Sequence, residues 1–251
     1  MLLKNNSSIF WKINMYELKT RWKVEKYFRP SLDSQDKPNK GVEWLVHHIP
    51  KTAGTSLRKT FENAFGVNAV FGVYLNTGQL DLTAGKPIWT PRNAKVLFGH
   101  VQANAEQSIY YPNAKRLAWV RDPLERLWSN IGHTLKTKQP EGIYNYLKTN
   151  FLDKGIDNIE VMIETMLKDN VHKGYVEIYS QYFRHMPIEK FDFIGSVHRN
   201  REDLDKLQEI LGVRLVEKRN NVLNKKQQYS PKLKSLQNYL QREYEIVADY
   251  L

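Results

Sequence analysis

A short run of small residues, hydroxyls and one lysine lies between two apolar segments near the start of the chain. It reads Pro-Lys-Thr-Ala-Gly-Thr-Ser over residues 50–56. Residues 42–49 are mostly β-branched or apolar and predict a buried strand, and the apolar spacing of residues 57–65 predicts a helix. The first N–H groups of a helix are unpaired and lie at the positive end of its dipole, so they attract phosphate. Because Lys51 adds a positive charge, this loop predicts a phosphate-binding site.

Two more polar residues stand at the ends of predicted buried strands. Residues 95–101 form an apolar segment that ends around His100, and residues 116–121 form another that ends in Arg121. Alternating strands and helices predict a parallel sheet, whose ligands bind at the carboxyl ends of its strands. We therefore expect Lys51, His100 and Arg121 to share one site.

A helix is predicted to begin directly after Arg121. Asp122 suits its N-cap and Pro123 its first position. Its expected buried stripe consists of Leu124, Leu127, Trp128, Ile131 and Leu135. Ser129 lies on a different face, together with Glu125, Gly132 and His133. Asp122 and Arg126 are interpreted as structural, the first as a cap and the second as a partner for a nearby group.

These two phosphate-type segments resemble those of sulfotransferases that use 3′-phosphoadenosine-5′-phosphosulfate (PAPS). His-Ile-Pro-Lys-Thr-Ala-Gly-Thr-Ser is similar to the 5′-phosphosulfate loop of the carbohydrate branch that includes heparan sulfate 2-O-sulfotransferase. The segment from Arg121 to Ser129 resembles the 3′-phosphate motif of the same enzymes. The resemblance covers residues 42–251 and implies a P-loop-like parallel sheet flanked by helices in a single domain. It implies that PAPS is held by Lys51, Thr52, Ala53, Gly54, Thr55, Ser56, Arg121 and Ser129.

The chemistry of sulfuryl transfer needs a base for the acceptor and a positive charge for the leaving phosphate. A histidine with a pKa of ~6.5 suits the first role, and Lys51 suits the second. In the heparan 2-O-sulfotransferase group, a histidine in a similar Gly-His-Val context is the base, which implies His100 here. That group has a second histidine two residues earlier, where this chain has Phe98, so a two-histidine mechanism does not carry over. His133 is the reserve candidate, while His47 and His48 are read as structural residues of the first strand.

Two other function classes stay open at the level of sequence. A nucleotide phosphotransferase would need the Walker A order of glycine, four residues, glycine, lysine and a hydroxyl residue, whereas Lys51 precedes the glycine of its loop. A nucleic-acid-binding protein would explain the basic charge but not two phosphate motifs, and no nucleic acid is expected. No metal is expected, because the sequence offers no ligand cluster. Preference for 3′,5′-adenosine bisphosphate (PAP) over ATP would separate the three classes.

The charge of the chain points to an anionic partner. Its formal net charge is +11 and its pI about 9.5. We expect the acceptor to be a saccharide hydroxyl, in an acidic polysaccharide or a glycolipid. A small phenol, an alcohol or a peptide tyrosine is the alternative. The acceptor surface is predicted around Tyr175, Tyr179, Tyr182 and Arg184.

The 251 residues are expected to form one sulfotransferase-like domain over residues 42–251 after a basic, aromatic extension and linker over residues 1–41. The extension can touch a membrane surface, although packing on the domain is the simpler reading. The basic stretch 214–226 either closes over the nucleotide or is a solvated charge run. The chain contains no cysteine, no apolar run of about 20 residues and no signal-peptide pattern. These features favour a soluble, cytoplasmic protein without a transmembrane segment.

Overall fold

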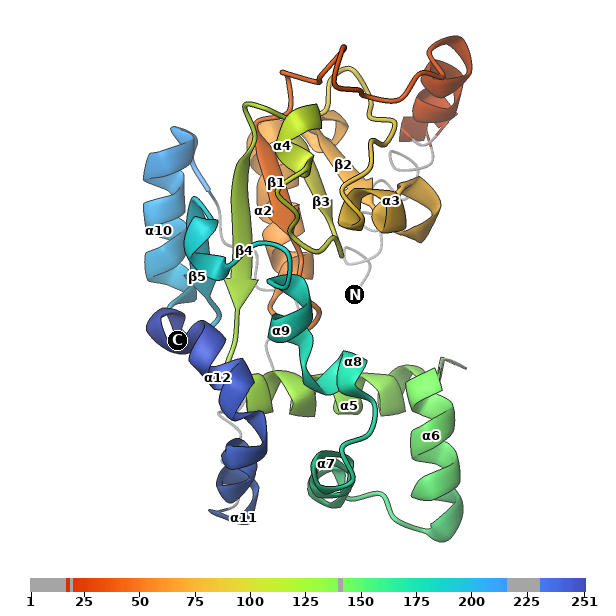
Figure 1. Cartoon of the computed structure of the whole chain (residues 1–251), viewed down its shortest axis with the longest axis vertical. Coiled ribbons are helices and arrows are strands. Elements are labelled where there is room, and N and C mark those ends of the chain that lie inside the picture. Colours follow the sequence, from red (N-terminus) through yellow and green to blue (C-terminus); the bar gives the residue numbers. More distant parts are fainter. Residues whose placement is uncertain (1–16, 19, 140–141, 216–230) are drawn as a thin grey trace, which may run out of the picture.

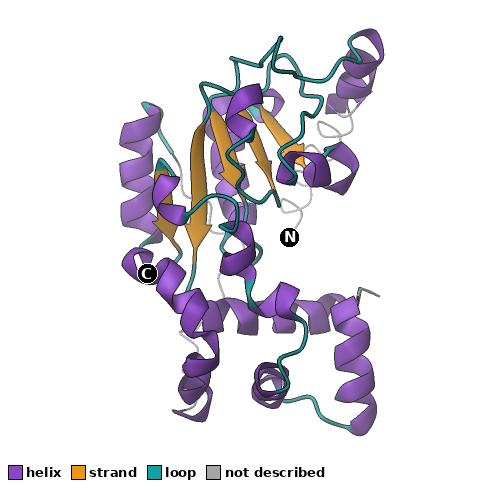
Figure 2. Ribbon diagram, in the orientation of Figure 1, coloured by secondary structure: helices purple, strands orange, loops and turns teal. Residues whose placement is uncertain are grey.

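A five-stranded parallel sheet forms the centre of the fold in a computed structural model of the chain (Figure 2). The structure describes residues 17–18, 20–139, 142–215 and 231–251. The strand order is β2-β3-β1-β4-β5, and every paired neighbour is parallel. The strands are β1 (Trp44–His47), β2 (Val70–Val73), β3 (Val96–Gly99), β4 (Lys115–Val120) and β5 (Phe193–Ser196). The expected α/β fold with a parallel sheet flanked by helices is confirmed.

Helices cover both faces of the sheet because side chains alternate between the faces along each strand. On one face, Trp44, Val46 and Trp119 pack with α2 (Gly54–Phe65) and α10 (Asn200–Leu211). On the other face, Leu45 and Leu97 pack near α3 (Gln79–Thr83), while α4 (Gln107–Tyr110) follows β3. Farther along this second face, Ala118 and Val120 pack against α9 (Ile178–Tyr182) and α12 (Gln241–Val247). The strands are therefore buried on both sides, as in other parallel sheets.

A separate group of helices lies beyond the carboxyl ends of the strands. Figure 1 shows α5 crossing below the sheet, with α6, α7 and α11 farther out. This group buries its own apolar core, which includes Leu127, Ile131, Leu147, Met162 and Met166. Its helices are α5 (Pro123–Thr137), α6 (Gly142–Asn150), α7 (Ile159–Lys168), α8 (Lys173–Val176) and α11 (Pro231–Ser235). Short 3-10 helices complete the described elements: η1 (Val67–Ala69), η2 (Leu75–Thr77), η3 (Leu152–Lys154), η4 (Ile188–Lys190), η5 (Leu236–Leu240) and η6 (Ala248–Tyr250).

The segment before β1 is tied to the loop that precedes β3. Residues 20–28 are helical, and the Trp89 Nε1–H donates to the carbonyl of Arg29 at 2.8 Å. The Thr90 hydroxyl donates to the buried Asp33 carboxylate at 2.5 Å. Burial raises the pKa of Asp33 above its usual value, against the effect of this hydrogen bond. The predicted linker thus includes a buried, hydrogen-bonded anchor.

Sequence and structure differ mainly at the ends of elements. The predicted strand 42–49 contracts to β1, which leaves His48 beyond its end. Helix α10 begins at Asn200, and Arg199 occupies its N-cap position. Residues 1–16 of the extension and residues 216–226 of the basic stretch lie outside the described residues. Within the part of the chain that is described, each helix is too short or too polar to cross a bilayer.

Candidate functional site

The loop between β1 and α2 has a backbone suited to an anion. Lys51 and Ala53 both lie in the left-handed region, with φ of 72° and 63°. Ala53 is the N-cap of α2 and is followed by helical Gly54, so a left-handed residue stands next to a right-handed one. Such a pair turns successive N–H groups toward one concavity, which binds anions. The Ser56 N–H donates to the Ala53 carbonyl at 3.0 Å, so the earlier amides of the helix N-terminus are the ones that suit a phosphate.

Two contacts hold this loop in place. Thr52 is fully buried, and its hydroxyl donates to the carbonyl of Ile49 at 2.8 Å. Its side chain is therefore structural, which leaves its main chain for a ligand. Gly54 packs against the ring of His48, since a Cβ at Gly54 would lie 1.7 Å from His48 Nε2. Only glycine allows α2 to begin this close to the end of β1.

His100 lies at the end of β3 and stacks on His48. The ring centroids are 4.4 Å apart, with an angle of 26° between the planes. The close approach of β3 to β2 requires Gly99, because a Cβ there would lie 1.8 Å from the carbonyl oxygen of Val73. His48 thus touches both the loop, through Gly54, and the predicted base. The sequence pattern predicts His48 inside a strand, whereas it lies just beyond the end of β1.

The hydrogen bond of His100 fixes its tautomer. Its Nδ1 lies 2.8 Å from the carbonyl oxygen of His48. A carbonyl can only accept, so Nδ1 carries the proton and Nε2 carries a lone pair. Burial lowers the pKa of His100, with the Nδ1 hydrogen bond acting in the opposite direction. Both effects of the surroundings considered, His100 favours the neutral imidazole more than a free histidine does, and its basic nitrogen is Nε2.

Two tyrosines support this histidine pair. The Tyr182 hydroxyl donates to the same His48 carbonyl at 3.0 Å, and the ring of Tyr74 meets His100 edge-on with centroids 5.7 Å apart.

The other two histidines near this point are largely withdrawn from water. Burial is the main reason that the pKa of His48 falls to about 3. His48 is thus neutral as well, so it stacks on His100 without charge repulsion. His47, the last residue of β1, bonds the Val101 carbonyl at 2.9 Å and is buried, in agreement with a structural role.

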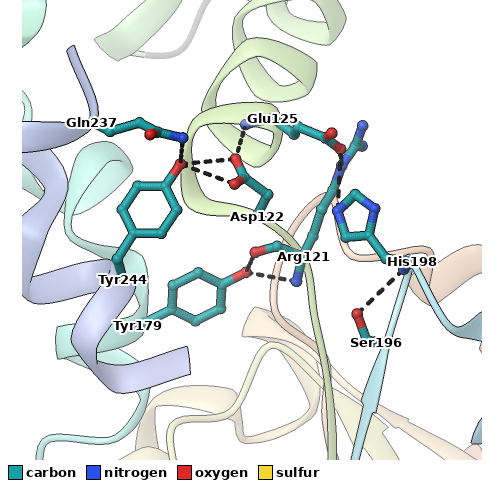
Figure 3. A network of polar contacts seen from close by, with 8 residues as sticks. All are labelled: Arg121, Asp122, Glu125, Tyr179, Ser196, His198, Gln237 and Tyr244. Atoms are coloured by element: carbon teal, nitrogen blue, oxygen red, sulfur yellow. Dashed lines mark hydrogen bonds and ion pairs between the residues drawn. The ribbon is translucent and has the colours of Figure 1, made fainter. Parts of the chain in front are cut away.

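Arg121 directly follows β4, the strand that pairs with β1 on the side opposite β3. The hydroxyl of Tyr179 bridges its backbone, accepting from the Arg121 N–H at 2.9 Å and donating to the Arg121 carbonyl at 2.6 Å (Figure 3). Tyr179 is itself fixed by Glu243, whose carboxylate accepts from the Tyr179 N–H at 2.7 Å. Helix α12 therefore positions α9, and α9 positions the residue at the end of β4.

The residues predicted from separate parts of the chain meet near Lys51. Burial lowers the pKa of Lys51, and the positive charge of Arg121 lowers it further. His133 is exposed on α5, and its pKa is lowered by partial desolvation first and by the charge of Lys51 second. The charge of Lys51 also acts on His48. The sheet order places the ends of β3, β1 and β4 side by side, which brings His100, Lys51 and Arg121 to the same edge of the sheet.

The remaining predicted residues lie around this site in different settings. Ser129 is half-buried on α5. Asp122 caps α5 as expected, accepting from the Glu125 N–H at 2.9 Å, and it also accepts from the Tyr244 hydroxyl (Figure 3). Arg126 is buried and donates through Nη2 to the carbonyl of Tyr175. Its partner is therefore a main-chain group of another segment.

The predicted acceptor surface needs a correction. Tyr179 is 0% exposed and Tyr182 5% exposed, and their hydroxyls bond the backbone of Arg121 and His48. Their rings cannot lie on the face of a sugar. Tyr175 is half-buried and Arg184 is exposed, so they stay candidates for that surface. Sequence alone showed an aromatic, polar segment but not the partners that bury two of its rings.

No group of three or more histidine, cysteine, aspartate or glutamate side chains suited to a metal ion is found among the described residues.

No family model matches the chain, and no curated protein matches it. The solved structures that resemble its fold include two sulfotransferases. One, a sulfotransferase from Alicyclobacillus acidocaldarius, is 12% identical with a TM-score of 0.45, over 84% of this chain and 95% of that one. The other, mouse sulfotransferase SULT7A1 complexed with PAP, is 12% identical with a TM-score of 0.41, over 72% of this chain and 62% of that one. Identity this low assigns no role to any residue of this chain.

Proposed function

We propose that this chain transfers the sulfuryl group of PAPS to an acceptor hydroxyl. The observation that carries the proposal is the histidine pair beside the loop. His100 presents a basic Nε2, and His48 joins it to Gly54 at the start of α2. A base and a phosphate-type loop thus lie at neighbouring strand ends, with Arg121 on the other side. This is the set of groups that transfer between a nucleotide and a hydroxyl requires.

In the proposed reaction, the acceptor oxygen attacks the sulfur of PAPS while its proton passes to His100 Nε2. The bond between sulfur and the bridging oxygen breaks, and the bonding pair leaves on the 5′-phosphate of PAP. The ammonium of Lys51 meets the charge that develops on this leaving oxygen. The first amides of α2 hold the 5′-phosphate. Arg121 and Ser129 hold the 3′-phosphate, as the resemblance of their segment implies.

We propose that the acceptor is a saccharide, in an acidic polysaccharide or a glycolipid. The net charge of +11 supports this choice, because it attracts a polymer that carries carboxylates or sulfates. A phenol, an alcohol or a peptide tyrosine is the competing acceptor class. The similarity of the Gly-His-Val strand end to carbohydrate sulfotransferases favours the saccharide.

Incubation with radiolabelled PAPS and a panel of glycans, glycolipids, phenols and tyrosine peptides tests this proposal. We expect label to transfer to a saccharide and to require the wild-type histidine at position 100. Label confined to phenols or peptides would refute the saccharide while leaving sulfuryl transfer intact. A chain that binds PAP but labels no member of a broad panel would count against the enzymatic proposal itself.

A further inference from the structure

A second network links Arg121 to two residues that the sequence patterns did not single out for the site. The Arg121 Nε–H donates to Glu125 Oε2 at 3.1 Å. The same oxygen lies 3.4 Å from Nε2 of His198, which comes from the segment between β5 and α10. Figure 3 shows the Glu125 carboxylate in contact with both the arginine and the histidine. We propose that Glu125 and His198 are positioning residues that aim the Arg121 guanidinium at the 3′-phosphate of the nucleotide, an inference that rests on the proposed function.

The pair between Arg121 and Glu125 differs from an ordinary ion pair on a helix surface. Arg121 lies outside α5, which begins at Pro123, so the pair joins the end of a strand to the first turn of a helix. Both side chains are partly withdrawn from water, with relative exposures of 18% and 25%. The backbone of Arg121 is already fixed through Tyr179. The contact with Glu125 therefore sets the direction of the side chain.

The geometry of the pair suits a guanidinium that must also bind an anion. An arginine side chain has five N–H donors, and the contact with Glu125 uses the one on Nε. The two Nη groups form the edge that binds a phosphate in bidentate fashion. Holding a flexible arginine in one orientation before binding reduces the entropy lost when the ligand arrives.

A carboxylate close to an anion site would repel the anion, so its negative charge must be stabilised by the protein. The structure shows two stabilising effects. The charge of Arg121 acts unfavourably on Lys51, so a carboxylate beside Arg121 offsets this repulsion when the site is empty. The Glu125 carboxylate also lies in the first turn of α5, where the helix dipole stabilises it. His198 contacts the same oxygen from a different strand end, which keeps the carboxylate turned toward Arg121.

The test compares the affinities of PAP and AMP, which differ by the 3′-phosphate, measured by isothermal titration calorimetry. For Glu125→Ala we expect PAP to bind about tenfold more weakly, the effect of losing one hydrogen bond to a charged group, while AMP binds as before. Glu125→Gln retains an oxygen for Arg121 Nε and should recover most of the lost affinity. His198→Ala should weaken PAP binding in the same direction, again with little effect on AMP.

A matched control and the fold of the variants make the result interpretable. Glu164→Ala removes another four-residue-spaced pair, with Lys168, on α7, and should leave both affinities unchanged. The α5 cap survives in Glu125→Ala because the backbone N–H of residue 125, not its side chain, donates to Asp122. If Glu125→Ala keeps the wild-type ratio of PAP to AMP affinity, or binds PAP more tightly, the inference is wrong while the proposed function stands. If the wild type itself binds PAP and AMP equally, the proposed function is wrong, and the inference that rests on it is wrong as well.

Discussion

His100→Ala is expected to lower the turnover of sulfuryl transfer by about 10²–10⁴-fold, the usual contribution of a positioned general base. PAP affinity should stay close to that of the wild type, because the proposed base touches the acceptor and not the nucleotide. His133→Ala is the matched control, since His133 is exposed on α5 and its ring lies outside the contact between His48 and His100. Loss of activity in His133→Ala with full activity in His100→Ala would move the base to α5.

The pH dependence of turnover follows from the same residue. Burial lowers the pKa of His100, so its neutral form persists to more acidic pH than that of a free histidine. Turnover should therefore be level around neutral pH and fall as the pH drops through this lowered pKa, where Nε2 becomes protonated. An acid limb at or above the ordinary histidine pKa of about 6.5 would contradict the assignment.

Lys51→Ala is expected to lower turnover by about 10²–10³-fold, the range for losing one group that stabilises transition-state charge. The fold should tolerate the change. Lys51 has φ of 72°, but alanine meets the same left-handed strain as lysine, so the substitution adds little cost. The melting temperature and the turnover with PAPS under saturating acceptor would be compared with those of Lys95→Ala. Lys95 pairs with Glu43 just before β3, away from the carboxyl ends of the strands. Near-normal turnover in Lys51→Ala would reduce Lys51 to a surface charge.

Local patterns predicted the parts of the site that depend on nearby residues. The pattern around residues 50–56 indicates a loop between an apolar strand and an amphipathic helix, and Asp122-Pro123 marks the start of α5. The sheet order then placed the ends of β3, β1 and β4 together, as expected for parallel strands. The loop and the start of α5 can be recognised in the sequence because each depends on residues only a few positions apart.

The groups that support the site depend on distant partners and gave no such signal. His48 lies 52 positions from His100, and strand periodicity alone places it inside the predicted strand over residues 42–49. Tyr182 reaches the same carbonyl from 134 positions away. A tyrosine looks the same in a sequence whether its hydroxyl meets water or a buried carbonyl, so Tyr179 and Tyr182 were expected at an acceptor surface. Arg126 was likewise expected to find a nearby partner, although its bond is to the carbonyl of Tyr175.

The central claim, a site for a nucleotide with both 5′- and 3′-phosphates, is tested most directly by thermal unfolding with PAP, AMP and ATP. At a ligand concentration about 100 times its dissociation constant, PAP should raise the melting temperature by about 5–10 °C. AMP and ATP at the same concentration, with or without magnesium, should raise it much less. The preference should disappear in Arg121→Ala, which removes the charge expected to meet the 3′-phosphate. Equal shifts from PAP and AMP in the wild type, or a larger shift from ATP with magnesium, would contradict the assignment of this site to PAPS.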